Sequence, residues 1–185
     1  MKKKLIIIAS VVCCIALAAT GTIAYFTAED TAQNRITTGD VAIEVEELDA
    51  DGDPFVDVID VMPGDSVTKI AQVRNTGSNA VWVRVSVELA IELAEGIEGT
   101  PDTSLVTLDY NTTDWTLGTD GYYYYNSILE PGEVTEPLFT TVTFDLEDMG
   151  NMYMNATAVI DVYAYATQAA NNGATVFEAQ GWPEP

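Results

Sequence analysis

Two long segments of the chain alternate between two sets of residues, and this alternation limits the possible folds more than any other feature. Between residues 81 and 89 every second residue is aliphatic; the five are Val81, Val83, Val85, Val87 and Leu89. Between residues 152 and 167 one set of alternate positions is small or aliphatic: Ala156, Ala158, Ile160, Val162, Ala164 and Ala166. A period of two over so many residues is typical of a β-strand with one buried face. Both segments are therefore predicted as long strands.

Shorter segments with strand character occur along the rest of the chain, between turns rich in Gly, Pro and Asn. Strands are predicted at 41–46, 55–61, 67–75, 105–110, around Trp115, at 122–126 and at 139–146. The stretch 92–104 is predicted as a loop, although 90–95 also fits a helical turn, and 174–180 has weak helical character. Many short strands without a long helix favour an all-β antiparallel β-sandwich. A jelly roll and an immunoglobulin-like sandwich both fit this pattern.

The N-terminus has the composition of a secretory signal helix. Three lysines, Lys2 to Lys4, precede an uncharged apolar run that contains both cysteines and ends at Ala19. A basic head followed by such a run is the order of a signal peptide. An uncleaved membrane anchor is the alternative, because the run extended to Phe26 reaches the length that spans a bilayer.

Small residues predict where the signal peptide is cut. They favour cleavage between Ala24 and Tyr25, and earlier alternative sites are offered by Ala18, Ala19 and Thr20. Cleavage there divides the chain into a signal peptide at 1–24, a polar N-terminal segment at 25–38 and a β-sandwich domain at 39–185.

The charge of the chain excludes several classes of function. There are 29 acidic residues, 7 basic residues and no histidine, which gives a net charge of −22. Removal of the signal peptide would leave four basic residues against all 29 acidic ones, a net charge of −25. A chain of this charge does not neutralise phosphates, so nucleic-acid binding is not expected. Without histidine, Ser-His-Asp, Cys-His and HExxH chemistries are excluded.

The densest acidic cluster contains four candidate metal ligands: Asp49, Asp51, Asp53 and Asp57. Alternate carboxylates in a tight turn suit calcium, which binds several oxygen ligands. The spacing matches the start of an EF-hand loop but does not continue as one, because Gly52 occupies the fourth position and Pro54 follows. Two interpretations remain open, a bound calcium ion and a solvated acidic loop.

Aromatic residues and the last long strand are candidates for binding surfaces. The run Tyr122 to Tyr125, together with Trp82 and Trp115, fits either an exposed aromatic interface or a strand buried on both faces. The segment 152–167 would invite pairing with another chain if it lay at the edge of its sheet, because an edge strand has unpaired backbone groups.

Several short motifs, in this order behind this signal peptide, resemble the TasA/camelysin family of secreted proteins of Gram-positive bacteria. The motifs are Gly21-Thr22-Ile23-Ala24-Tyr25-Phe26-Thr27, Ile36-Thr37-Thr38-Gly39-Asp40-Val41, Met62-Pro63-Gly64-Asp65, Arg74-Asn75-Thr76-Gly77-Ser78, Asp120-Gly121-Tyr122-Tyr123, Glu130-Pro131-Gly132-Glu133 and Val162-Tyr163-Ala164-Tyr165. They cover essentially the whole chain.

The resemblance implies a jelly-roll sandwich, processing by a signal peptidase of the SipW type, and a role as a biofilm-matrix or cell-surface fibre subunit. Family members assemble by donor-strand exchange, which implies self-association or pairing with a related fibre subunit, and no membrane contact after cleavage. Carried onto this chain, the donor segment runs from Tyr25 to about Thr38, with Tyr25, Phe26 and Ile36 as its main apolar residues. The strongly acidic chain predicts assembly that depends on salt or divalent cations.

Two other functions stay open beside the fibre subunit. The family also carries a metallo-endopeptidase label, but a chain without histidine or an HExxH motif is expected not to be an enzyme of that kind. A monomeric surface binding module with an acidic face is the other alternative.

Overall fold

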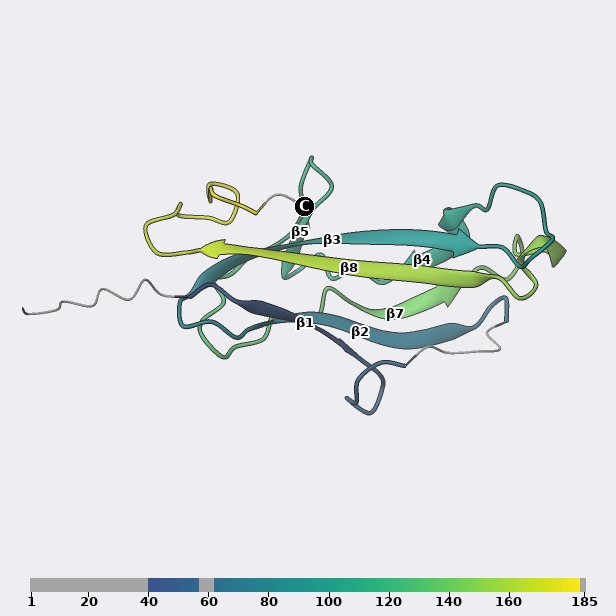
Figure 1. Ribbon diagram of the computed structural model, residues 1–185, viewed down its shortest axis with the longest axis horizontal. Helices are drawn as coiled ribbons and strands as arrows, with labels where there is room; N and C mark the ends of the chain where they lie inside the picture. Colours follow the sequence, from purple (N-terminus) through teal and green to yellow (C-terminus); the bar gives the residue numbers. More distant parts are fainter. Residues whose placement is uncertain (1–39, 57–61, 184–185) are drawn as a thin grey trace, which may run out of the picture. The chain divides into compact units, whose positions relative to one another are not determined.

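The long alternating segments pair with each other in the structure, a computed structural model that describes residues 40–56 and 62–183 (Figure 1). In the described residues there are two antiparallel four-stranded sheets, ordered β1-β2-β7-β4 and β5-β6-β3-β8. The strands are β1 (Ile43–Leu48), β2 (Ser66–Asn75), β3 (Val81–Glu92), β4 (Val106–Leu108), β5 (Trp115–Leu117), β6 (Tyr123–Tyr125), β7 (Phe139–Phe144) and β8 (Thr157–Gln168). Two 3-10 turns, η1 (Thr103–Leu105) and η2 (Asn151–Tyr153), interrupt the loops. The predicted all-β class is confirmed.

The pairing of β3 with β8 is the longest among the described strands and agrees with the predicted alternation. It runs in unbroken antiparallel register from Val81 opposite Gln168 to Glu92 opposite Thr157. Val81, Val83 and Val85 are buried, and the alternate residues of β8 from Ala158 to Ala166 face the same interior. The two strands with the strongest sequence patterns therefore pair along their whole length and cover one side of the core.

In the long ladder, one boundary of each strand differs from the prediction. β3 continues past Leu89 to Glu92, where a helical turn or a loop was expected, because Ile91 is buried against Val106 and Val142 and so extends the inward face. β8 begins at Thr157 instead of residue 152, since residues 151–153 form η2 and Asn155 takes a positive φ of 58°.

The other two differences lie outside the long ladder. The strand predicted at 55–61 is wrong for Phe55 and Val56, which lie outside any strand, and residues 57–61 are outside the described part. Residues 174–180 form a turn instead of a helix. Their apolar residues Val176 and Ala179 are nevertheless buried.

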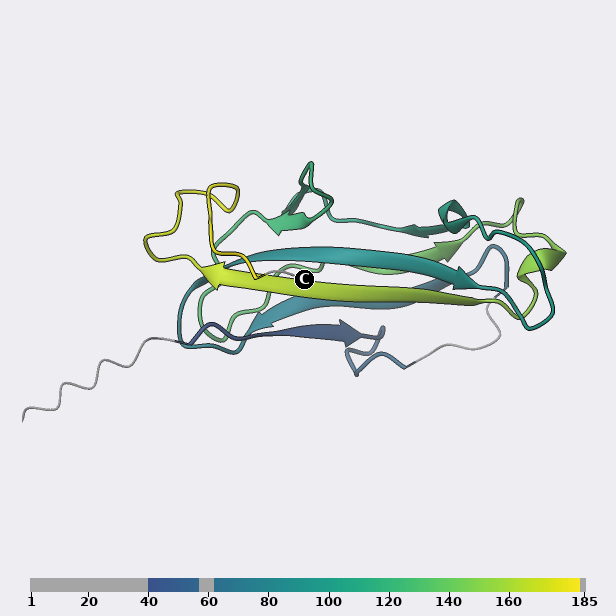
Figure 2. The same cartoon turned by 45° about the horizontal axis from the view of Figure 1, so that its top comes forward.

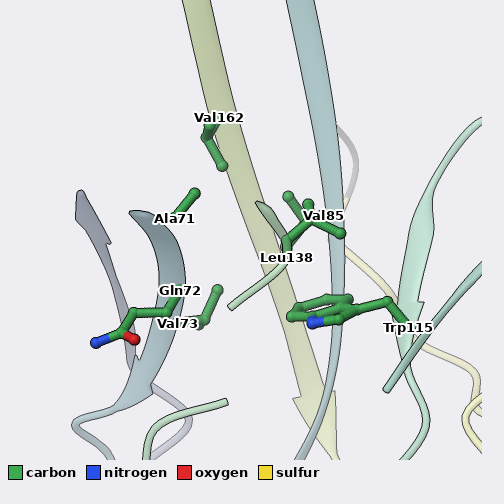
Figure 3. Close-up of a pocket in the computed structure, with 7 residues that line it drawn as sticks. All are labelled: Ala71, Gln72, Val73, Val85, Trp115, Leu138 and Val162. Atoms are coloured by element: carbon green, nitrogen blue, oxygen red, sulfur yellow. The ribbon is translucent and has the colours of Figure 1, made fainter. Parts of the chain in front are cut away.

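The core lies between the two sheets and is closely packed. Its largest fully buried side chains include Trp115, Phe139, Leu129 and Leu138, and the indole N–H of Trp115 donates to the Glu136 carbonyl at 2.9 Å. The narrow gap drawn in Figure 3 has no room for a water molecule; it is lined by Ala71, Gln72, Val73, Val85, Trp115, Leu138 and Val162. The polar end of Gln72 points away from the others (Figure 3) and binds Glu46 outside the core. This part of the interior is packing and does not form a ligand site.

Candidate functional site: the open side of the sandwich

The longest unpaired backbone edge in the described residues belongs to β8. β8 is the last strand of its sheet and pairs only with β3 in the part of the chain that the structure describes. Because an edge strand leaves every second N–H and C=O without a partner, the 12 residues of β8 present a long template for another strand. The sequence-based condition that this strand lies at an edge is therefore met.

β1 is the edge of the other sheet and lies on the same long side of the sandwich as β8 (Figures 1 and 2). We call this the open side, defined by the outer edges of β1 and β8. Ile43 of β1 and Ile160 and Val162 of β8 point inward here but are only half-buried. The open side thus offers unpaired backbone beside incompletely covered apolar side chains.

The outward faces along the open side carry acidic side chains that form no ion pair with another described residue. Glu88 of β3 lies directly opposite Asp161 of β8, and like charges in such a pair repel. The charge of Asp161, followed by that of Glu88, raises the pKa of Tyr163, which is 44% exposed at the same place. A second chain that approaches this edge would meet negative charge.

Two basic residues neutralise part of β1. Arg74 donates to the Glu46 carboxylate, and this hydrogen bond is the main cause that lowers the pKa of Glu46. Lys69 is buried on the inner face, where its ammonium lies 2.9 Å from Glu47 and 4.6 Å from the centre of the Phe55 ring. These cations are engaged within the chain and are not available to an incoming acidic partner.

The acidic turn after β1 uses one of the predicted metal ligands to hold its own backbone. Asp49 Oδ1 accepts the N–H groups of Asp51 and Asp53 at 2.9 and 3.0 Å, and the side chains of Asp51 and Asp53 are exposed. Asp57 lies outside the described residues. Among residues 40–56 and 62–183, no group of three His, Cys, Asp or Glu side chains is arranged to hold a metal ion.

The tyrosine run forms an inner strand that is covered on both faces. Tyr123 and Tyr125 pack against the core between the sheets. Tyr124 points to the outer face, where it is only 8% exposed under the C-terminal segment, which we define as residues 169–183. The structure therefore supports the interpretation of a strand buried on both faces.

Sequence reasoning missed the contact that joins this outer face to the end of the chain. Arg84 of β3 lies 4.1 Å from the Tyr122 ring centre and 4.9 Å from that of Trp182, and its Nη2 donates to the Pro183 carbonyl. One feature of the sequence could have indicated this contact: Trp82 is an apolar residue on the outward face of a strand, so another segment should cover it.

The predicted cleavage and donor residues lie outside the described part of the chain. These are Ala24, Tyr25, Phe26 and Ile36. In the residues that the structure does describe, no helix is long and apolar enough to cross a membrane.

Comparison with known proteins identifies the family. No curated protein matches the chain. The model of the family described as camelysin metallo-endopeptidase matches residues 1–97, which is more than half of the chain and includes β1, β2 and β3. The chain belongs to the camelysin family, as its motifs predicted.

Proposed function

We propose that this protein is a secreted structural subunit that assembles into fibres at the surface or in the matrix of a Gram-positive bacterium. The observation that carries the proposal is the outer edge of β8, a strand of 12 residues that pairs with no described strand other than β3. Natural sheets blunt such edges with short strands, prolines or covering loops. Within residues 40–56 and 62–183 the edge of β8 has none of these devices, so it is suited to accept a strand from another chain.

The order of the strands supports a jelly-roll sandwich in which no described strand takes the first position. β2-β7-β4 and β8-β3-β6 are neighbours as in a jelly roll. In that fold the first strand pairs with the last, whereas here β1 pairs with β2. The outer edge of β8 is therefore the position that the first strand of a jelly roll would occupy.

The segment 25–38, freed by cleavage after Ala24, is the proposed donor. Extended at about 3.3 Å per residue it spans about 46 Å, enough to cover β8, which spans about 40 Å. Its apolar residues Tyr25, Phe26 and Ile36 would cover the half-buried Ile160 and Val162 on the open side. The donation of a strand by each copy to the next does not close on itself and so yields a filament.

Electron microscopy of the secreted protein beginning at Tyr25 tests this function. Filaments are expected, and an excess of a synthetic peptide with the sequence 25–38 should cap them, while a scrambled peptide should not. A protein that stays monomeric at high concentration, with salt and with calcium, would instead support the monomeric binding module.

The family description keeps a metallo-endopeptidase as the second candidate. It requires a metal site built without histidine, because the chain has none. Casein cleavage that co-purifies with the protein and disappears with a chelator would establish this activity; the absence of cleavage with added zinc or calcium would remove it.

A further inference from the structure

Beside its apolar packing and its contacts with Arg84, the C-terminal segment is tied to the end of β8 by the side chain of one asparagine. The amide nitrogen of Asn172 has three acceptors within reach: Thr167 Oγ1 at 3.2 Å and the carbonyls of Gln168 and Gln180, each at 2.9 Å. Its Oδ1 accepts the Gln180 N–H at 2.9 Å. One side chain thus joins the end of β8 to the far end of the segment.

The residue after Asn172 has to be glycine in this fold. Gly173 has a φ of +80°, and a Cβ at this position would lie 2.9 Å from the backbone carbon of Glu178. The turn therefore creates an Asn-Gly pair, and Asn172 is the only asparagine of the chain that glycine follows. In the described residues the N–H of Gly173 donates no backbone hydrogen bond, and Gly173 is exposed to solvent.

We propose that Asn172-Gly173 is a self-modification site at which spontaneous deamidation releases the C-terminal segment. The backbone nitrogen of Gly173 forms a bond to Cγ of Asn172, the Cγ–Nδ2 bond breaks, and the proton of the Gly173 N–H leaves with the amide as ammonia. Water then opens the succinimide ring at either carbonyl and leaves aspartate or isoaspartate. Glycine permits the attack because no side chain shields its nitrogen.

The reaction and the docking of the segment oppose each other. The nitrogen that leaves is the one held by Thr167, Gln168 and Gln180, so these contacts must open before or during the reaction. The product is a carboxylate, which cannot donate a hydrogen bond and would face two carbonyl oxygens. Deamidation is therefore slow while the segment is docked and prevents it from docking again.

Release would expose an aromatic surface that lies apart from the open edge of β8. The segment covers Trp82 and Tyr124, which are 4% and 8% exposed, with its own Val176 and Ala179. The indole N–H of Trp82 donates to the Asn172 carbonyl at 2.9 Å, so this contact also depends on the turn at Asn172. In the modified protein Trp82 and Tyr124 would be exposed to solvent instead of covered. This inference stands independently of fibre formation.

The rate of deamidation in variants tests the coupling. The secreted protein is incubated at mildly alkaline pH, and the peptide with Asn172 is followed by mass spectrometry. Trp182→Ala removes an aromatic contact that holds the segment and should speed deamidation by roughly tenfold or more. Val142→Ala, at the other end of the core, should leave the rate unchanged. Equal rates in the wild type, in Trp182→Ala and in the denatured chain would overturn the proposal.

The consequence is tested without a variant, on wild-type protein that anion exchange separates into intact and deamidated forms. The deamidated form should be cut by chymotrypsin after Phe177 at least several-fold faster and should emit tryptophan fluorescence at longer wavelength. Asn172→Asp should reproduce both effects, and Asn171→Asp, which changes the same charge at the exposed neighbour, should not. A deamidated form as resistant as the intact one would show that Asn172 does not hold the segment.

Discussion

The two long sides of the sandwich are built in opposite ways. On one side, β4 and β5 have three residues each, and the loop from Asp109 to Asp114 passes from the first sheet to the second. We call this the closed side. On the open side β8 has 12 residues, and no connection between the sheets runs along it in the described part of the chain. A long exposed edge is therefore a property of one side and not of the fold as a whole.

The closed side is held by polar and aromatic contacts of its loop. Asp109 accepts the backbone N–H groups of Thr140 and Thr141 at 2.7 and 2.6 Å. Tyr110 stacks on Tyr123 with ring centres 4.4 Å apart, and burial, followed by the Tyr123 interaction, raises its pKa. A closed edge of this kind has little backbone left to offer to another chain.

The largest expected difference is in the free energy of unfolding that is lost when an apolar residue of each side is truncated. Trp115→Ala on the closed side should lower the free energy of unfolding by about 3–5 kcal/mol, because it empties a fully buried position. Val162→Ala on the open side should cost only about 1 kcal/mol in the monomer, because Val162 is half-buried. Urea unfolding of the monomeric protein measures both. Equal losses would mean that the open side is as well covered as the closed one.

The next effect is electrostatic: the free energy of unfolding should depend on pH through Asp109 of the closed side. Partial burial acts to raise the pKa of Asp109, but the hydrogen bonds from Thr140 and Thr141 outweigh it and lower the pKa below its usual value. The stability that Asp109 contributes is thus complete above the ordinary carboxyl pKa and is lost as the pH falls through the lowered one.

Asp109→Ala should cost about 1–2 kcal/mol at neutral pH and should flatten the acid limb of the stability curve. Urea midpoints measured from neutral to strongly acidic pH give the answer. As a control, Asp51→Ala removes an exposed carboxylate of the acidic turn that accepts no hydrogen bond from the described residues and should change neither quantity. An acid limb that Asp109→Ala leaves unaltered would contradict this role.

These elements also show how far the sequence predicts the molecule. The alternation at 81–89 and 152–167 predicts β3 and β8, since inward and outward residues differ in kind. It does not predict that β8 lies at an edge, because the order of strands depends on contacts between distant segments. The acidic turn is misjudged more easily, because composition cannot tell whether Asp49 faces an ion or its own backbone.

The outer aromatic face was beyond prediction for a different reason. Arg84 contacts Trp182 and Pro183, which lie almost a hundred residues later in the sequence. The C-terminal segment has no periodic pattern from which this contact could be predicted. Its apolar residues are spaced by the path of a turn instead of a helix or strand.

The smallest effect on stability concerns the charge of the open side. Asp161→Lys replaces a repulsive pair with Glu88 by an attractive one and should stabilise the monomer by about 0.3–0.5 kcal/mol. Its larger effect should be on assembly, which we expect to need less salt, because an approaching acidic chain is repelled less. Light scattering against salt concentration compares the variant with the wild type. If the variant and the wild type need the same salt concentration, the charge of Asp161 does not repel the approaching chain.

Hydrogen exchange of the assembled and monomeric protein tests the proposed use of the open side most directly. In the monomer, the amides of β8 that point to the open edge should exchange much faster than the amides bonded to β3. In filaments we expect protection to appear along 157–168 and along 25–38 together, while the closed side stays unchanged. Filaments that leave the exchange of β8 unaltered would contradict the assignment of its edge as the acceptor.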